Sequence, residues 1–192
     1  PNGHRLLAAA LHNAGTLHWL VGETEHAASL YHEAMVMQER LYPAADYPHG
    51  HRLLMASYVA WAGVLRGEGD LDGAACYLDK AHAIALAQYP EADYPNGHNE
   101  LAMVWRSLGQ LRRAQGDYAS AVAWFQKMLD SYQSRYAAAF PDGHVLICTA
   151  LSELGRTRAA AGDCERARDY LEQSFAMRRE LFACQDYPWG HP

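Results

Sequence analysis

One short pattern returns along the chain at an almost constant interval. It reads YPHGH at 47–51, YPNGH at 94–98, FPDGH at 140–144 and YPWGH at 187–191, and PNGH opens the chain. The intervals between successive motif histidines are 47, 47, 46 and 47 residues, for His4, His51, His98, His144 and His191. A fixed period of this size is typical of an array in which each repeat is one supersecondary unit. The period therefore constrains the fold before any other feature is considered.

Each interval contains two stretches in which apolar residues have helical spacing. In the third interval one stretch runs from Leu101 to Leu111 with apolar residues on a single face, and a second follows over 121–129. Trp105 and Trp124 lie on these faces, so we expect them in the core. Two helices per unit are predicted, with approximate bounds 5–20, 24–41, 52–67, 71–88, 99–114, 118–135, 145–160 and 164–182.

A glycine and an acidic residue separate the two helices of every unit. The glycine stands eighteen residues after each motif histidine, at Gly22, Gly69, Gly116 and Gly162. Glycine suits the left-handed turn that ends a helix. The next residue can cap the second helix with its carboxylate, and this residue is Glu23, Asp70, Asp117 or Asp163.

Two roles are open for the motif histidines. A metal site needs ligands that converge on one ion, whereas equivalent positions in stacked units lie roughly 10 Å apart; the local pair His49 and His51 is the best metal candidate. In a structural role, proline ends the preceding helix and glycine supplies the turn. The histidine ring then accepts a bond from a free N–H of the next helix or packs under an aromatic residue of the loop. The structural role is favoured, and no metal or cofactor is expected.

The repeated segments resemble the tetratricopeptide repeat (TPR) family. LHNAG, WRSLG and LSELG are similar to the first helix of that repeat, and GDYASAVAWF and GDCERARDYL to the start of its second helix. The resemblance implies an all-α, right-handed superhelical solenoid of four helix–turn–helix units, at 1–47, 48–94, 95–140 and 141–187, with 188–192 beginning another. The long unit is similar to those of kinesin light chains and of bacterial arrays that accompany CHAT-type proteases or STAND NTPases, which suggests a piece of a longer protein.

Composition excludes several classes of function. The net charge of −6 argues against nucleic-acid binding, and no apolar run reaches the roughly 18 residues of a membrane helix. Four scattered cysteines form no CxxC pair, which favours a reducing, cytoplasmic compartment: Cys76, Cys148 and Cys164 on helices, and Cys184 in a loop. No P-loop, nucleophile elbow or paired-carboxylate motif is present. We therefore expect no enzyme activity within these residues.

The family resemblance implies that the first helices of the units line a concave groove that binds a protein or peptide. The residues in the groove positions would be His12, Thr16 and Trp19 from the first unit, Val59 and Arg66 from the second, Arg106, Gln110 and Arg113 from the third, and Ser152 and Arg156 from the fourth, with Arg112 and Arg158 beside them. Acidic residues gather on the second helices instead. The carboxylate clamp of some TPR domains is not carried over, because its asparagine positions hold other residues.

The arginines allow two interpretations. They bind an acidic ligand segment, or they pair with acidic residues of neighbouring helices and lie in solvent. Trp19 either anchors an apolar side chain of a partner or packs on the second unit. The chain as a whole is interpreted as a protein-binding scaffold or, alternatively, as the regulatory arm of a larger effector of the CHAT or STAND type. Uncovered apolar faces at the two ends would favour end-to-end association.

Overall fold

The computed structural model describes residues 4–182, and within them the chain forms eight α-helices and no strand. The helices are α1 (Arg5–Leu20), α2 (Thr24–Leu41), α3 (Arg52–Glu68), α4 (Leu71–Gln88), α5 (Asn99–Ala114), α6 (Tyr118–Tyr136), α7 (Val145–Ala160) and α8 (Cys164–Leu181). Each bound lies within one residue of the bound predicted from the sequence. The all-α fold class and the pairing of helices in every unit are confirmed.

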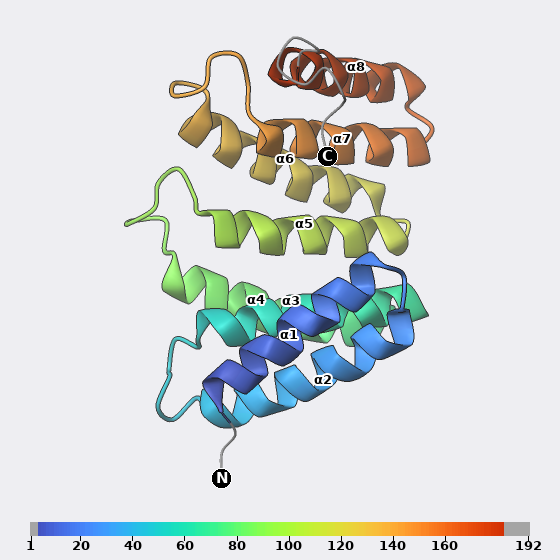
Figure 1. The fold of residues 1–192 in the computed structure, drawn as a ribbon. Helices are drawn as coiled ribbons and strands as arrows, with labels where there is room; N and C mark the ends of the chain where they lie inside the picture. Colours follow the sequence, from blue (N-terminus) through green and yellow to red (C-terminus); the bar gives the residue numbers. More distant parts are fainter. Residues whose placement is uncertain (1–3, 183–192) are drawn as a thin grey trace.

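The helices stack in chain order as antiparallel pairs, from α1 and α2 at one end to α7 and α8 at the other (Figure 1). The short turns within the pairs follow one edge of the stack. The long loops that carry the repeated motif follow the opposite edge, on the left of Figure 1. Each helix packs on its neighbours in the chain, and α3 also contacts α5 directly. The first helices of successive units are therefore neighbours, and side chains from different units can meet on them.

The turns within the pairs have the glycine geometry that the sequence predicts. Gly22, Gly69, Gly116 and Gly162 have φ between 78° and 87°. The acidic caps form in three of the four units: the carboxylates of Asp70, Asp117 and Asp163 accept backbone N–H groups of the first turn of the second helix. The prediction is wrong for Glu23, whose longer side chain makes no cap bond and instead contacts Nδ1 of His18 at 2.5 Å.

The motif histidines cap the first helix of each described unit. Nδ1 of His4, His51, His98 and His144 accepts the backbone N–H two residues later at 3.2 Å. Three of the rings also stack on the aromatic residue that ends the preceding helix. The ring centroids are 3.7 Å apart for His51 and Tyr42, 3.9 Å for His98 and Tyr89, and 4.1 Å for His144 and Tyr136. Both structural roles considered for these histidines therefore occur together. His191 lies outside the described residues.

The aromatic residue of the motif, in the loop, contacts the motif histidine as well. Tyr94 meets the ring of His98 edge-on, at 5.4 Å between centroids and 79° between planes. The residue that stacks face to face is therefore not the motif aromatic but Tyr89, five positions earlier. The motif glycine Gly97 has φ of 74°, so it makes the left-handed turn that brings His98 back under Tyr89.

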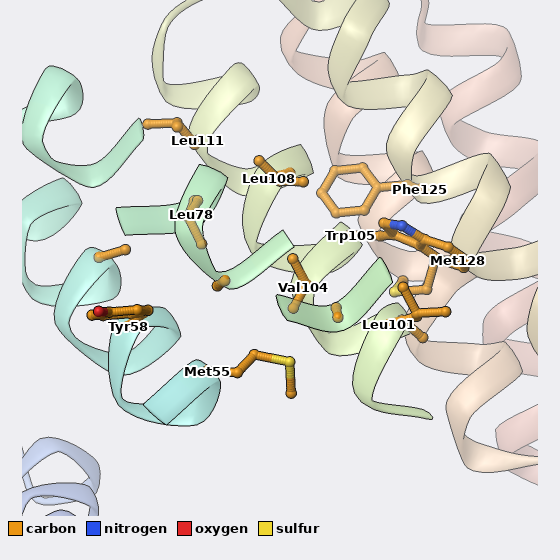
Figure 2. Close-up of a cluster of buried hydrophobic side chains, with 14 of the residues drawn as sticks. Met55, Tyr58, Leu78, Leu101, Val104, Trp105, Leu108, Leu111, Phe125 and Met128 are labelled. Atoms are coloured by element: carbon orange, nitrogen blue, oxygen red, sulfur yellow. The ribbon is translucent and has the colours of Figure 1, made fainter. Parts of the chain in front are cut away.

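The main apolar core extends from α2 to α7 (Figure 2), and a smaller cluster lies between α2 and α3. Leu101, Leu108 and Trp105 from α5 pack beside Phe125 from α6, and Trp105 is only 5% exposed. Trp124 is partly buried against the same core, as its apolar position predicts. Gly109 permits the close approach of α5 and α6, because a Cβ there would lie 2.7 Å from the ring of Phe125. Neighbouring units therefore share one core.

Candidate partner-binding surface

The predicted groove residues lie on the first helices of the four pairs. His12, Thr16 and Trp19 are on α1, Val59 and Arg66 on α3, Arg106, Gln110 and Arg113 on α5, and Ser152 and Arg156 on α7. Arg66 and Arg113 occupy the same position of two successive units. Since α3 and α5 are in contact, the structure brings these two arginines close to each other. The residues from α1 and Arg156 do not join them.

A buried carboxylate, Glu153 on α7, sits among the side chains of α5. Arg106 Nε donates to its Oε1 at 3.3 Å, Gln110 Nε2 donates to the same oxygen at 2.9 Å, and Arg113 Nη1 donates to Oε2 at 2.8 Å. The Glu153 side chain is only 3% exposed, whereas that of Arg106 is 48% exposed. We call Arg66, Arg106 and Arg113 the arginine cluster, with Glu153 as its internal counter-ion.

The hydrogen bonds keep Glu153 ionised despite its burial. Burial acts to raise the pKa of this carboxyl, but hydrogen bonds from Gln110 and Arg113 and the charges of Arg113 and Arg106 outweigh it, so the pKa is lowered. A buried charge without partners destabilises the folded state by several kcal/mol. The two guanidinium groups of Arg106 and Arg113 compensate the charge of Glu153. Arg113 also donates to Thr157 Oγ1 at 3.3 Å. The contact therefore fixes α7 against α5.

The side chain of Arg66 has neither an ion pair nor a hydrogen bond to any described residue, whereas its backbone carbonyl accepts a bond from Gly69. Its side chain is half-buried, and burial is the main cause of its lowered pKa. The charges of Arg113 and Arg106 lower the pKa further, and the charge of Glu153 acts in the opposite direction. The cluster thus holds three positive charges and one negative charge. Arg66 is the member whose donors are free.

The comparisons with known proteins agree with this architecture. Models of the tetratricopeptide repeat match residues 53–134 and residues 7–47 and 147–183. The chain belongs to the tetratricopeptide repeat family. Repeats of this family generally mediate protein–protein interaction, and their scaffold is generally non-catalytic. No curated protein matches the chain at a significant level.

Solved structures share the fold of this chain. BtubC (BKLC) from P. vanneervenii is 17% identical with a TM-score of 0.68, and the match covers 97% of this chain and 66% of that one. The nearly identical TPR-like repeats of a Podosopora anserina protein described as a kinesin light chain are 19% identical with a TM-score of 0.64, over 93% of this chain and 78% of that one. A substituted form of those repeats has a TM-score of 0.67 at 19% identity, over 93% and 77%. This TPR chain thus spans about two thirds of BtubC.

The predicted groove residues His12 and Thr16 on α1 belong to a polar group that is separate from the arginine cluster. His12 lies edge-on to Tyr31, and its Nδ1 is 3.4 Å from Ser57 Oγ of the next unit. Thr16 donates to the carbonyl of His12 and accepts from the hydroxyl of Tyr31. Burial lowers the pKa of His12. These contacts hold the first repeat together, so they leave little of His12 and Thr16 for a partner.

Trp19 fits both alternatives in part, packing on the second repeat and exposure to a partner. Its ring faces α3, since a Cβ on Gly67 would lie 3.6 Å from Cη2 of Trp19. The residue is nevertheless 37% exposed and borders a hollow of about 300 Å³ together with Val64. Trp19 therefore packs partly on the second repeat and keeps part of its ring in solvent.

The pairing with acidic residues that the second interpretation describes occurs for Arg106 and Arg113, through Glu153 of α7, and for one arginine outside the cluster. Arg158 pairs with Asp163 of its own repeat at 3.4 Å, and Arg112 donates to Gln115. Arg156 is exposed and has no ion pair to a described residue. Within the fourth repeat, Ser152 shares a hydrogen bond with Ser174. The arginine cluster is thus confined to the second and third repeats.

Glu153 is a site residue that was not predicted from the sequence. Acidic residues were expected on the second helices, yet Glu153 stands on a first helix, in the motif LSELG. Aligned on the motif histidines, its position holds Asn13, Ala60 and Ser107 in the other repeats. An acid at a position that is otherwise uncharged is the signal that could have revealed it.

Residues 4–182 have three further properties. No group of three or more histidine, cysteine or acidic side chains is placed to hold a metal ion. None of the eight helices is long and apolar enough to cross a membrane. Cys148 is buried and Cys76 and Cys164 are exposed on their helices, whereas Cys184 lies outside the described residues.

Proposed function

We propose that this chain is a non-catalytic scaffold that binds an acidic segment of a protein partner along the first helices of its repeats. The observation that carries the proposal is the surplus of positive charge in the arginine cluster. The guanidinium groups of Arg106 and Arg113 pair with one carboxylate, and the nearby Arg66 adds a third positive charge whose donors are free. A carboxylate of the partner would accept the free donors of Arg66, because guanidinium groups bind carboxylates through paired N–H donors.

Arg106 contributes to the same proposal from the solvent side. It contacts Glu153 through Nε alone, and almost half of its side chain is exposed. The terminal nitrogens of Arg106 therefore remain able to donate to a ligand. Arg113 is more enclosed, with 23% of its side chain exposed, and it is held by Glu153 and Thr157. Arg66 and Arg106 are the proposed contacts, and Arg113 holds Glu153 in place.

The overall charge favours steering toward this cluster. The chain carries a net charge of −6, so an acidic segment is repelled by most of the surface and attracted at the arginine cluster. Such attraction is screened by salt over about 10 Å at 0.1 M ionic strength. Binding that depends on the cluster should therefore weaken as the salt concentration rises.

A glutamate-rich peptide with a fluorescent label tests the proposal, with a glutamine-rich peptide of the same length as the control ligand. We expect Arg66→Gln to weaken binding of the acidic peptide at least about tenfold, since a charge-assisted bond contributes about 1.5–3 kcal/mol. Arg179→Gln is the matched control, because it removes one arginine whose side chain is 70% exposed on α8. Equal loss in the two variants, or equal binding of the two peptides, would refute the assignment.

The alternative function is a regulatory arm of a larger effector of the CHAT or STAND type. The long unit and the repeated YPxGH motif favour it, because arrays with similar units accompany such domains. The proposal is tested by the reading frame that encodes the chain. An array with no effector domain on either side would contradict it.

A further inference from the structure

The two ends of the described stack expose residues whose counterparts in other repeats are buried. Leu17 on α1 is 66% exposed, whereas Val64 and Leu111, in the same position of the next two repeats, are 3% and 1% exposed. At the other end Leu171 on α8 is 41% exposed, whereas its counterparts Leu78 and Phe125 are 2% and 0% exposed. The exposure therefore depends on the position of the repeat in the stack.

The contact between α2 and α3 shows what these positions do inside the chain. Val64 of α3 packs in one cluster with Ala27 and Tyr31 of α2. This is a junction between the second helix of one repeat and the first helix of the next. By the alignment on the motif histidines, Leu17 corresponds to Val64, and the pair Ala167 and Leu171 on α8 corresponds to Ala27 and Tyr31. One molecule therefore carries both halves of this junction, one at each end.

The half on α8 is a shallow apolar hollow of about 460 Å³. Ala167 and Leu171 form its floor with Ala159, and Phe175 borders it with 67% of its surface exposed. The counterparts of Phe175 in the first and third repeats, Met35 and Leu129, are 2% and 4% exposed. At internal junctions the first helix of the following repeat covers this face.

We propose that the chain associates head to tail with a second copy of itself, α1 of one copy covering α8 of the other. Leu17 then occupies the hollow beside Leu171 and Phe175, as Val64 lies beside Tyr31 within the chain. The contact continues the stack of repeats across two molecules. Because its two sides differ, the contact leaves one free face at each end of the pair and can extend further.

The charges at the two faces are compatible with this contact. Arg168 and Glu172 border the hollow on α8. Helix α1 carries no acidic side chain, and its only formal charge is Arg5 at the first residue. Glu172 therefore meets no like charge when α1 is placed over it. The proposal concerns the ends of the stack and does not depend on the ligand of the arginine cluster.

Sedimentation velocity of the 192-residue chain over rising concentration tests the proposal. We expect the average mass of the wild type to increase with concentration. Leu17→Glu blocks the α1 face and Phe175→Glu blocks the α8 face, and each should weaken association at least tenfold. Both residues are mostly exposed, so the fold should tolerate the change, and matched circular dichroism spectra check this. Leu86→Glu is the control, because Leu86 is 48% exposed on α4, away from both ends.

A mixture of the two variants gives the decisive result. Leu17→Glu keeps an intact α8 face and Phe175→Glu keeps an intact α1 face, so the mixture should form one-to-one pairs and nothing larger. A wild type that stays monomeric at every concentration would overturn the proposal, and so would a mixture that does not pair. Association of either variant at the level of Leu86→Glu would also overturn it.

Discussion

Replacing His98 with alanine measures how much the repeated motif contributes to stability. The ring caps α5 through Nδ1, lies 3.9 Å from Tyr89 with 5° between the planes, and meets Tyr94 edge-on at 5.4 Å. Loss of a helix cap costs about 1 kcal/mol, and each aromatic contact contributes about 0.5–1.5 kcal/mol. Since the ring is only partly buried, we expect His98→Ala to lower the free energy of unfolding by about 2 kcal/mol.

Urea unfolding followed by circular dichroism provides the assay, with two matched variants. His98→Asn retains a capping side chain but loses the stack, so it should lose about half as much. His4→Ala removes a cap of the same 3.2 Å geometry from α1, where no ring contact accompanies it, and should cost about 1 kcal/mol. If His98→Ala costs no more than His4→Ala, the aromatic cluster contributes nothing and the reasoning fails.

The same residue predicts a dependence on pH. Burial lowers the pKa of His98, the charge of Glu100 acts in the opposite direction, and the charge of Arg135 lowers it further. The folded state therefore favours the neutral ring, whose Nδ1 accepts the cap bond. Its stabilisation is complete above the ordinary pKa of 6.5 and is lost as pH falls from there through the folded pKa. The difference between wild type and His98→Asn should shrink over that interval.

Two further predictions concern stability. Glu153→Ala leaves the arginine cluster without its counter-ion and should lower the free energy of unfolding in urea by about 3 kcal/mol. Because the pKa of Glu153 is lowered, this loss should fade as pH drops below about 4.5, and a loss independent of pH would contradict the ionised carboxylate. Gly63→Ala should stabilise the chain by about 0.5–1 kcal/mol, since Gly63 lies within α3 with no atom near the added methyl group. Gly109→Ala should destabilise the chain by about 1–3 kcal/mol, because the added methyl group would contact Phe125. A higher melting temperature for Gly109→Ala than for Gly63→Ala would contradict the packing of α5 on α6.

The sequence is sufficient for the fold because its signals are local and repeated. The helix bounds follow from the motif proline, the turn glycine and the spacing of apolar residues, all within one unit. Gly116 and Asp117 show this well, since their roles depend only on the adjacent helix ends.

The contacts of the arginine cluster could not be predicted in the same way. Glu153 and Arg113 are 40 residues apart, and nothing local to either residue indicates that they meet. The same holds for Glu23: a capping position predicts a cap bond, but the choice of His18 as its partner depends on side-chain length and on the geometry of the turn. The sequence identified the charged residues, and the packing of α5 on α7 determined which of them remain free.

Each helix pair is stable because its neighbours cover it. Helix α5 buries seven residues, whereas α1 and α8 bury two each. Hydrogen exchange resolved by helix, at a concentration low enough to keep the chain monomeric, tests this most directly. We expect the slowest exchange in α5 and α7, which bury seven and eight residues, and the fastest in α1 and α8. Equal protection in all eight helices would contradict it.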